Sequence, residues 1–218
     1  RAKLYEKHKN YLEEIKSNSG RFEIVDAGIN SEYSDYGGSF FGDKLVFASA
    51  RDTGGVSKNI FKWNNQSFTN LYASKIGLDN NLEAPKRFDN KINSKFHEST
   101  PVFTKDGKTM YFTRNNFLNG KRGKDSKSVT LLKMYKSTLV DGQWANIAEL
   151  PFNSDNYSVA HPALSLDEKT LYFASDMPGT LGQSDLFKVT INENGTYSTP
   201  ENLGAKINTE GRETFPTI

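Results

Sequence analysis

HESTPVFTKDGKTMYFT (residues 97–113) and VAHPALSLDEKTLYFAS (residues 159–175) are two copies of one phrase, and they decide the fold of this 218-residue chain. Each copy consists of a step into proline (Pro101, Pro162), a polar turn and an aromatic strand. FFGDKLVFAS (40–49) is a weaker first copy. Such self-similarity at a nearly constant period marks a repeat architecture.

A fourth copy begins at the C-terminal end of the sequence, where ETFPTI (213–218) contains Pro216. An asparagine opens every copy, and these asparagines are Asn30, Asn93, Asn153 and Asn208. The repeats are therefore expected to span residues 30–92, 93–152 and 153–207, with 208–218 starting the next one.

Within each repeat the apolar pattern predicts four short strands. The first strand precedes the polar turn, and Asp106-Gly107 in the second copy is a strong hairpin signal. The second strand carries alternating large residues. The third is expected around Tyr72, Met134 and Phe187, and the fourth follows it at a constant interval. Four strands per unit of this length is typical of a β-propeller blade.

Residues 2–16 have a different period. Leu4, Tyr5, Tyr11, Leu12 and Ile15 fall on one face at helical spacing, so residues 1–20 are expected to form an amphipathic helix. The predicted fold is a mainly β chain. One helix precedes a partial propeller over residues 21–218, made of three blades and the start of a fourth, with the ring incomplete in this sequence.

Composition limits the function. A net charge of +2 provides no large field to attract nucleic acid, and no apolar run is long enough to span a membrane. The sequence contains no cysteine, which excludes disulfides, a thiol nucleophile and thiolate metal sites. No motif indicates a cofactor.

YFASDMPGTLGQSDLFKV (172–189) is the most specific part of the repeat. It resembles the signature of TolB-like, WD40-like propeller repeats in Bacteroidetes OmpA-family periplasmic proteins. In those proteins the propeller follows helical tetratricopeptide repeats and precedes a peptidoglycan-binding domain. The order is similar to that of PorE-type components of the type nine secretion system.

This resemblance implies a non-catalytic periplasmic scaffold associated with the outer membrane. Its partner would be an outer-membrane or secretion-system protein, and peptidoglycan would be held only by a domain outside this sequence. The first copy departs from the pattern, because Gly38 stands where the others have proline.

The alternative function is a ligand-binding or hydrolytic propeller that acts on a peptide or glycan through its central channel. The sequence shows no Gly-x-Ser-x-Gly elbow, and no carboxylate is unique to one inner strand. We therefore expect no enzymatic activity, and a channel-lining cluster of acid, base and aromatic residues would favour the alternative.

Four residues of the signature, Asp176, Gly179, Gly182 and Asp185, could suggest a cation loop. Their spacing lacks the alternating carboxylates of a calcium loop, so a tight crossover fixed by aspartate-to-backbone hydrogen bonds is the preferred interpretation. His97 and His161 do not occupy equivalent repeat positions, which argues against a shared metal site. His161 could face the channel or be a structural histidine.

The repeats differ in length mainly between their second and third strands, so these insertions should lie on one face. The first insertion contains Phe61 and Trp63, which could form an interface or pack on the sheet edge. The second is basic, with Lys121, Arg122 and Lys124, and could be a solvated loop or a contact to a partner or to anionic lipid. These five residues are the candidate partner-binding residues.

Overall fold

A computed structural model describes residues 10–17, 19–20, 23–51 and 60–218. It contains one helix, α2 (Tyr11–Ser17), in this part of the chain. The first half of the predicted helix, residues 2–9, lies outside the described residues. Among the described residues, no helix is long and apolar enough to cross a membrane.

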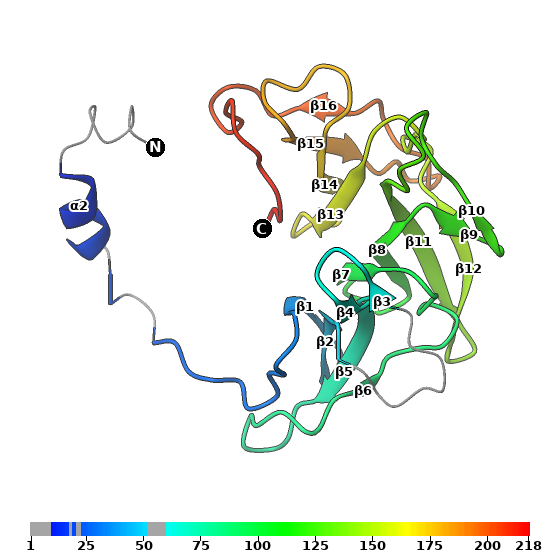
Figure 1. Cartoon of the computed structure of the whole chain (residues 1–218). Coiled ribbons are helices and arrows are strands. Elements are labelled where there is room, and N and C mark those ends of the chain that lie inside the picture. The colour runs from blue at the N-terminus through cyan, green and yellow to red at the C-terminus, as the bar shows by residue number, and fades with distance from the viewer. Residues whose placement is uncertain (1–9, 18, 21–22, 52–59) are drawn as a thin grey trace.

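The described chain is otherwise built mainly on three successive four-stranded antiparallel sheets, joined by turns and loops (Figure 1). The strands of the first sheet are β1 (Asp35–Phe41), β2 (Lys44–Ser49), β5 (Asn70–Lys75) and β6 (Lys86–Arg87). Those of the second are β7 (Glu98–Phe103), β8 (Thr109–Asn115), β11 (Leu132–Val140) and β12 (Gln143–Glu149). Those of the third are β13 (Val159–Leu164), β14 (Thr170–Ser175), β15 (Asp185–Thr190) and β16 (Glu201–Asn202). The predicted class, a mainly β chain of antiparallel sheets, is confirmed.

Two small hairpins lie between the second and third strands of the first two sheets. They are β3 (Ile60–Phe61) with β4 (Gln66–Ser67), and β9 (Phe117–Leu118) with β10 (Lys121–Arg122). Figure 1 shows the three sheets following one another along an arc, with β1, β7 and β13 on its inner side and the C-terminal segment running toward the same centre.

Each inner strand contains a bulge at the step that the sequence repeats. Two residues oppose one on the neighbouring strand: Gly37-Gly38, Thr100-Pro101 and His161-Pro162 lie opposite Phe47, Phe112 and Phe173. The first residue of each pair has positive φ, at 66°, 45° and 59°, and Phe215 before Pro216 has 55°. Proline fits here because a bulge removes one ladder hydrogen bond. The first copy keeps this conformation although it lacks the proline.

Hydrophobic cores fill the spaces between adjacent sheets. Met110, Phe112 and Tyr135 of the second sheet pack toward the first, while Tyr111 and Met134 pack toward the third. The second sheet is therefore buried on both faces, as strands between two layers are. This corrects the predicted register of the third strand, because Tyr135, and not Met134, lies opposite Phe112 as Tyr72 lies opposite Phe47.

From the second repeat onward, the asparagine that opens the repeat links it to the sheet before it. The side-chain amide of Asn93 accepts a hydrogen bond from Leu71 N (2.7 Å) and donates one to Leu71 O (2.9 Å). Asn153 makes the same pair of bonds to Met134, and Asn208 to Leu186. Each amide thus satisfies a backbone donor and acceptor of the previous third strand, which fixes the spacing between consecutive repeats.

The first two inner strands begin with an ion pair, which is partly buried in the first sheet and fully buried in the second. Asp35 contacts Arg51 at 3.0 Å, and Glu98 contacts Arg114 at 2.9 Å. Arg114 also lies over the rings of Phe112 and Tyr135, at 5.1 and 5.2 Å from their centroids. Such an arrangement compensates the guanidinium for its lost hydration.

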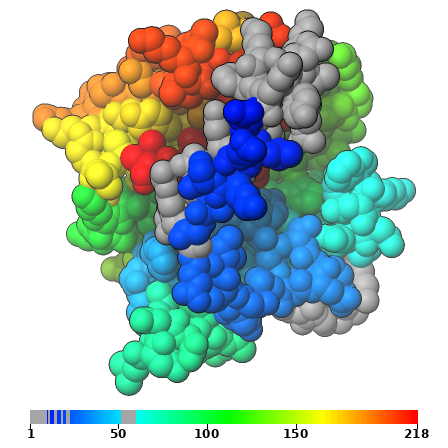
Figure 2. All heavy atoms as spheres, turned by 90° about the vertical axis from the view of Figure 1, so that its left-hand side faces the viewer, coloured from blue at the N-terminus to red at the C-terminus, as the bar shows by residue number. Residues whose placement is uncertain are grey.

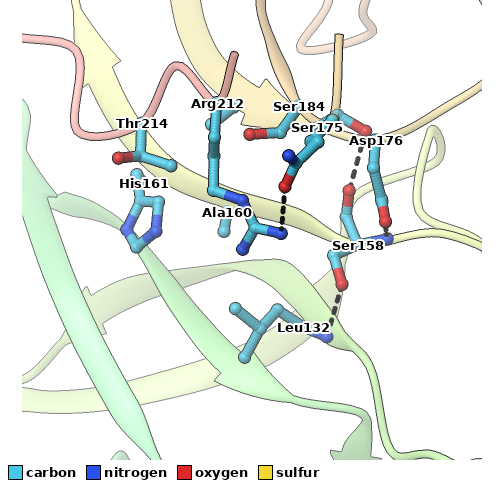
Figure 3. A pocket seen from close by; sticks show the side chains of 11 residues that line it. Leu132, Ser158, Ala160, His161, Ser175, Asp176, Ser184, Arg212 and Thr214 are labelled. Atoms are coloured by element: carbon cyan, nitrogen blue, oxygen red, sulfur yellow. Dashed lines mark hydrogen bonds between the residues drawn. The ribbon is translucent and has the colours of Figure 1, made fainter. Parts of the chain in front are cut away.

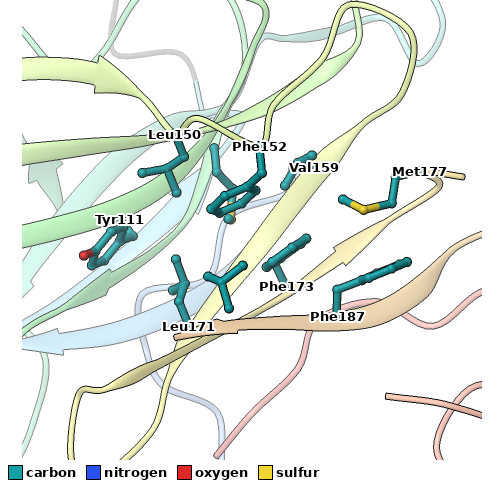
Figure 4. Close-up of a cluster of buried hydrophobic side chains, with 10 residues drawn as sticks. Tyr111, Leu150, Phe152, Val159, Leu171, Phe173, Met177 and Phe187 are labelled. Atoms are coloured by element: carbon teal, nitrogen blue, oxygen red, sulfur yellow. The ribbon is translucent and has the colours of Figure 1, made fainter. Parts of the chain in front are cut away.

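The third inner strand begins with Val159 instead. Val159 lies in a cluster with Phe173, Phe187 and Met177, and Phe152 stacks on Phe173 at a centroid distance of 4.9 Å (Figure 4). Met177 stands four residues after Phe173, as Arg51 stands four after Phe47. An apolar pair has therefore replaced a charged pair at equivalent positions.

Candidate functional site

The loop face is the face that carries the connections between the second and third strands, together with the starts of the inner strands. Two cavities open there. The aromatic cavity lies between the first two sheets and is lined by residues that include Phe61, Trp63, Phe68, Phe96, His97 and Arg122. The axial cavity lies where the third and fourth repeats meet and is lined by residues that include Ser158, His161, Asp176, Ser184, Arg212 and Thr214 (Figure 3).

The left-handed residues of the inner strands lie next to one another, and His161 is the one of them that lines the axial cavity. A methyl group on Gly37 would meet Thr100 Cγ2 at 2.9 Å. The hydroxyl of Thr100 lies 3.5 Å from His161 Nδ1, and the His161 ring lies 3.9 Å from the Phe215 ring, measured between centroids. Phe215 in turn meets Tyr36 edge-on at 6.1 Å. Positive φ at a β-branched or bulky residue is uncommon, and such residues gather at functional sites.

His161 is held by its backbone and by burial. Its N–H donates to Thr113 Oγ1 (2.8 Å), and Thr113 Oγ1 also lies 2.9 Å from Thr100 Oγ1. Burial lowers the pKa of His161 to about 4, because the charged imidazolium would lose hydration. The ring is therefore neutral near pH 7.

The fourth repeat closes the axial cavity from the other side. Gln183 N donates to Gly211 O, and Glu213 N donates to Ser184 O, so residues 211–213 run along residues 183–184. A methyl group on Gly182 would come within 2.6 Å of two carbonyl oxygens there, which explains the glycine. Figure 3 shows the Arg212 side chain reaching into the cavity, with Nη2 donating to Gln183 Oε1 at 3.3 Å.

The signature residues of the third repeat make hydrogen bonds to the backbone. Asp176 Oδ1 accepts from Ser158 N at 2.6 Å. Asp185 is fully buried and accepts from Leu181 N and Gly182 N. Gly179 has a φ of 98° and its carbonyl accepts from Asn202. In the described part of the chain, no group of three or more His, Asp or Glu side chains is placed to hold a metal ion.

Three of the five candidate partner-binding residues meet in the aromatic cavity. Phe61 and Trp63 come from the first insertion, and Arg122 comes from the second. Trp63 has 85% of its surface exposed. Lys121 and Lys124 are exposed on the basic insertion but do not line the cavity. In Figure 2 the part of the first insertion that begins at residue 60 (cyan) stands out at the edge of the molecule.

Sequence reasoning missed most of the polar residues of both cavities. Ser34, His97, Ser158 and Arg212 occupy one repeat position, just before the inner strand begins. This position varies between copies while the residues around it keep their pattern. Such a contrast is a usable signal, because variable residues on a constant scaffold are how repeat proteins build binding surfaces.

No protein-family model and no curated protein sequence matches the chain. Several solved structures resemble it. A puromycin-hydrolyzing peptidase of Mycobacterium tuberculosis is 16% identical, with a TM-score of 0.45. An alpha-L-arabinofuranosidase from Lactobacillus brevis (15%, TM-score 0.48) and a thermostable family-43 glycoside hydrolase (10%, TM-score 0.49) are also similar.

The likeness covers 82–84% of this chain but only 23% of the peptidase and 57% of each glycosidase. These neighbours correct one expectation. The sequence led us to expect no enzymatic activity, but the three solved structures named above are hydrolases, so that expectation is withdrawn. Because every TM-score is below 0.5, the likeness assigns no activity to this chain.

Proposed function

We propose that the chain belongs to a β-propeller that binds the end group of a peptide or glycan at the axial cavity. The observation that carries this proposal is the convergence of Ser158 and His161 from the third repeat with Arg212 and Thr214 from the fourth. A cavity with a few convergent polar groups is the default location for ligand binding. With about 140 Å³, it has room for one end group and not for a whole ligand.

The chemistry of the lining favours a polar or anionic end group. Arg212 supplies a positive charge and directional donors, and the neutral His161 ring supplies an acceptor or donor. Asp176 is engaged by Ser158 N. Hydrolysis of the bound ligand would require an acid or base close to the scissile bond, and His161 is the residue of the cavity best suited to that role.

Binding panels of glycans and of peptides test this proposal, with mass spectrometry of the same mixtures to detect cleavage. We expect Arg212→Gln to weaken binding by at least about tenfold, as loss of a charge-assisted hydrogen bond does. Lys206→Gln is the matched control, because Lys206 is exposed in the same terminal segment and outside the cavity. The proposal is wrong if no ligand binds, or if the two variants bind alike.

A scaffold role in the cell envelope is the second candidate, and the aromatic cavity favours it because aromatic side chains on loops are typical of protein interfaces. The periplasmic location and an outer-membrane or secretion-system partner remain predictions from the resemblance to TolB-like proteins. We also propose that the three sheets are consecutive blades, that residues 208–218 begin a fourth, and that α2 belongs to a helical repeat. The gene sequence on either side of this segment tests that organisation.

A further inference from the structure

We propose that the aromatic cavity is a docking site for an acidic peptide segment of a partner protein, which inserts one large apolar side chain. The proposal is independent of the axial cavity, because the two cavities share no residue. With a volume of about 550 Å³, the aromatic cavity is large enough for an aromatic or branched side chain and its neighbours.

The aromatic rings of the cavity hold one another in place. Phe61 meets the His97 ring edge-on at 4.7 Å between centroids, and Phe68 lies 4.6 Å from the same ring. Phe68 also contacts Phe96 at 5.8 Å. Such ring pairs add to the stability of their contacts, so the walls are preorganised before any ligand arrives.

Three polar acceptor atoms of the floor, His97 Nδ1, Asn115 Oδ1 and Thr130 Oγ1, are already engaged within the protein. His97 Nδ1 accepts from Thr69 N at 3.1 Å, which places the proton of the neutral ring on Nε2. Asn115 Oδ1 accepts from His97 N, and Thr130 Oγ1 accepts from Arg122 Nε at 2.6 Å. A sugar needs free partners for its many hydroxyl groups, whereas an apolar side chain needs none. The floor therefore favours an apolar anchor.

The rim of the cavity is positively charged. The Arg122 guanidinium lies over the Phe96 ring, with Cζ 5.3 Å from the ring centroid. Arg122 donates to Thr130 through Nε, so its two terminal amino groups can face a ligand. Lys62 also lines the cavity, and no carboxylate does so among the described residues. A fixed guanidinium with free terminal groups matches the planar geometry of a carboxylate. The complementary segment carries Asp or Glu beside its apolar anchor.

The shape of the site distinguishes a peptide from a membrane. Basic and aromatic residues also bind anionic lipid, but they do so on a convex surface that dips into the head groups. Here the rings of Phe61, Phe68 and Phe96 line a hollow. A side chain on an extended peptide reaches into a hollow, whereas a bilayer surface does not.

Trp63 provides a direct probe of occupancy. It is exposed, whereas Trp144, the other tryptophan, is 3% exposed, so a change in emission reports Trp63. The purified chain is titrated with the peptide Gly-Asp-Glu-Phe-Asp-Gly and with two controls. One control replaces Phe by Gly, and the other replaces the acidic residues by Lys. Vesicles with and without phosphatidylserine are titrated in parallel.

We expect the acidic Phe peptide to shift the Trp63 emission and to bind at least about tenfold more tightly than either control peptide. Arg122→Gln should weaken binding about tenfold and reduce its salt dependence, because it removes a charge-assisted contact. Lys124→Gln, the same charge change on the same loop outside the cavity, should alter it less than about twofold.

Three outcomes would overturn the proposal. The first is that no peptide of the set binds. The second is that Arg122→Gln and Lys124→Gln have the same effect, which would indicate nonspecific charge attraction. The third is that only the vesicles containing phosphatidylserine shift the emission. The side chains of Arg122 and Lys124 are both exposed, so the circular dichroism spectra of the two variants should match that of the parent protein.

Discussion

The second and third sheets share a backbone plan but differ in what they bury where the inner strand begins. The second sheet buries Glu98 against Arg114, and the third places Val159 among apolar side chains at the same point. Both sheets keep the bulge, with Thr100 and His161 in the left-handed conformation. The ion pair is therefore one of two solutions to filling this site, and the backbone geometry does not depend on it.

The first sheet shows that an arginine can reach this position from another place in the repeat. Arg51 holds Asp35 and donates to Ile29 O, and Arg114 donates to Ile92 O, the equivalent carbonyl. The two guanidinium groups reach the same place from different repeat positions. In the third sheet Met177 stands at the position of Arg51, and Phe152 stands at the position of Ile92. A larger ring and a flexible thioether take up the space of the charged pair.

The largest expected effect comes from breaking the ion pair of the second sheet. Arg114→Met leaves Glu98 buried and unpaired, which should lower the free energy of unfolding by about 4 kcal/mol. The double variant Glu98→Val/Arg114→Met puts two apolar side chains in the space of the charged pair, as Val159 and Met177 do in the third sheet, and should recover most of this loss. Urea unfolding at pH 7 measures both. Equal losses in the single and double variants would show that packing around the pair, and not its charge, is what matters.

Introducing the charge into the third sheet is the reverse experiment. Val159→Asp should lower the free energy of unfolding by about 3 kcal/mol, since Val159 is fully buried among apolar residues. Adding Met177→Arg should restore at least about 1 kcal/mol, because Arg51 reaches Asp35 from the equivalent position. Denaturant unfolding of the two variants tests this. Additive losses in the double variant would contradict the equivalence of the two sites.

Contact between the first two inner strands gives a smaller effect. Gly37→Ala should cost about 2 kcal/mol, because the new methyl group would meet Thr100 Cγ2 at 2.9 Å in addition to the strain of positive φ. Gly42→Ala has the same backbone strain but open space, and should cost about 1 kcal/mol. Thermal unfolding compares the two variants. Similar costs would show that the inner strands adjust freely to one another.

The sequence predicted the repeated strands because a polar turn followed by an aromatic strand recurs in successive copies, although the copies differ in length. The register of the third strand was harder to predict. Both faces of the second sheet are buried, so Met134 and Tyr135 are both apolar and the usual alternation is lost. A one-residue offset then carries no penalty in the pattern, although it exchanges the two faces of the sheet.

The candidate sites were predicted only in part. Phe61, Trp63 and Arg122 were identified as loop residues, but their meeting with Phe68, Phe96 and His97 depends on how two sheets pack. Arg212 lies in residues 208–218, where the pattern gives few neighbours to compare. Contacts between repeats are long-range, and a motif within one repeat does not encode them.

The smallest expected effect is a difference in how Glu98 on β7 and His161 on β13 make stability depend on pH. Burial raises the pKa of Glu98 to about 7 and lowers that of His161 to about 4. Glu98 binds its proton more tightly when folded, so its contribution to stability falls as pH rises from 4.5 to about 7. His161 binds its proton less tightly when folded, so its contribution falls as pH decreases from 6.5 toward 4. Asparagine tolerates positive φ, so His161→Asn is the test variant. The free energy of unfolding of this variant, taken relative to that of the parent protein, should therefore be about 1 kcal/mol higher at pH 5.5 than at pH 7.5. Glu98→Gln should show the opposite trend, and parallel pH profiles for all three proteins would mean that neither group titrates in this range.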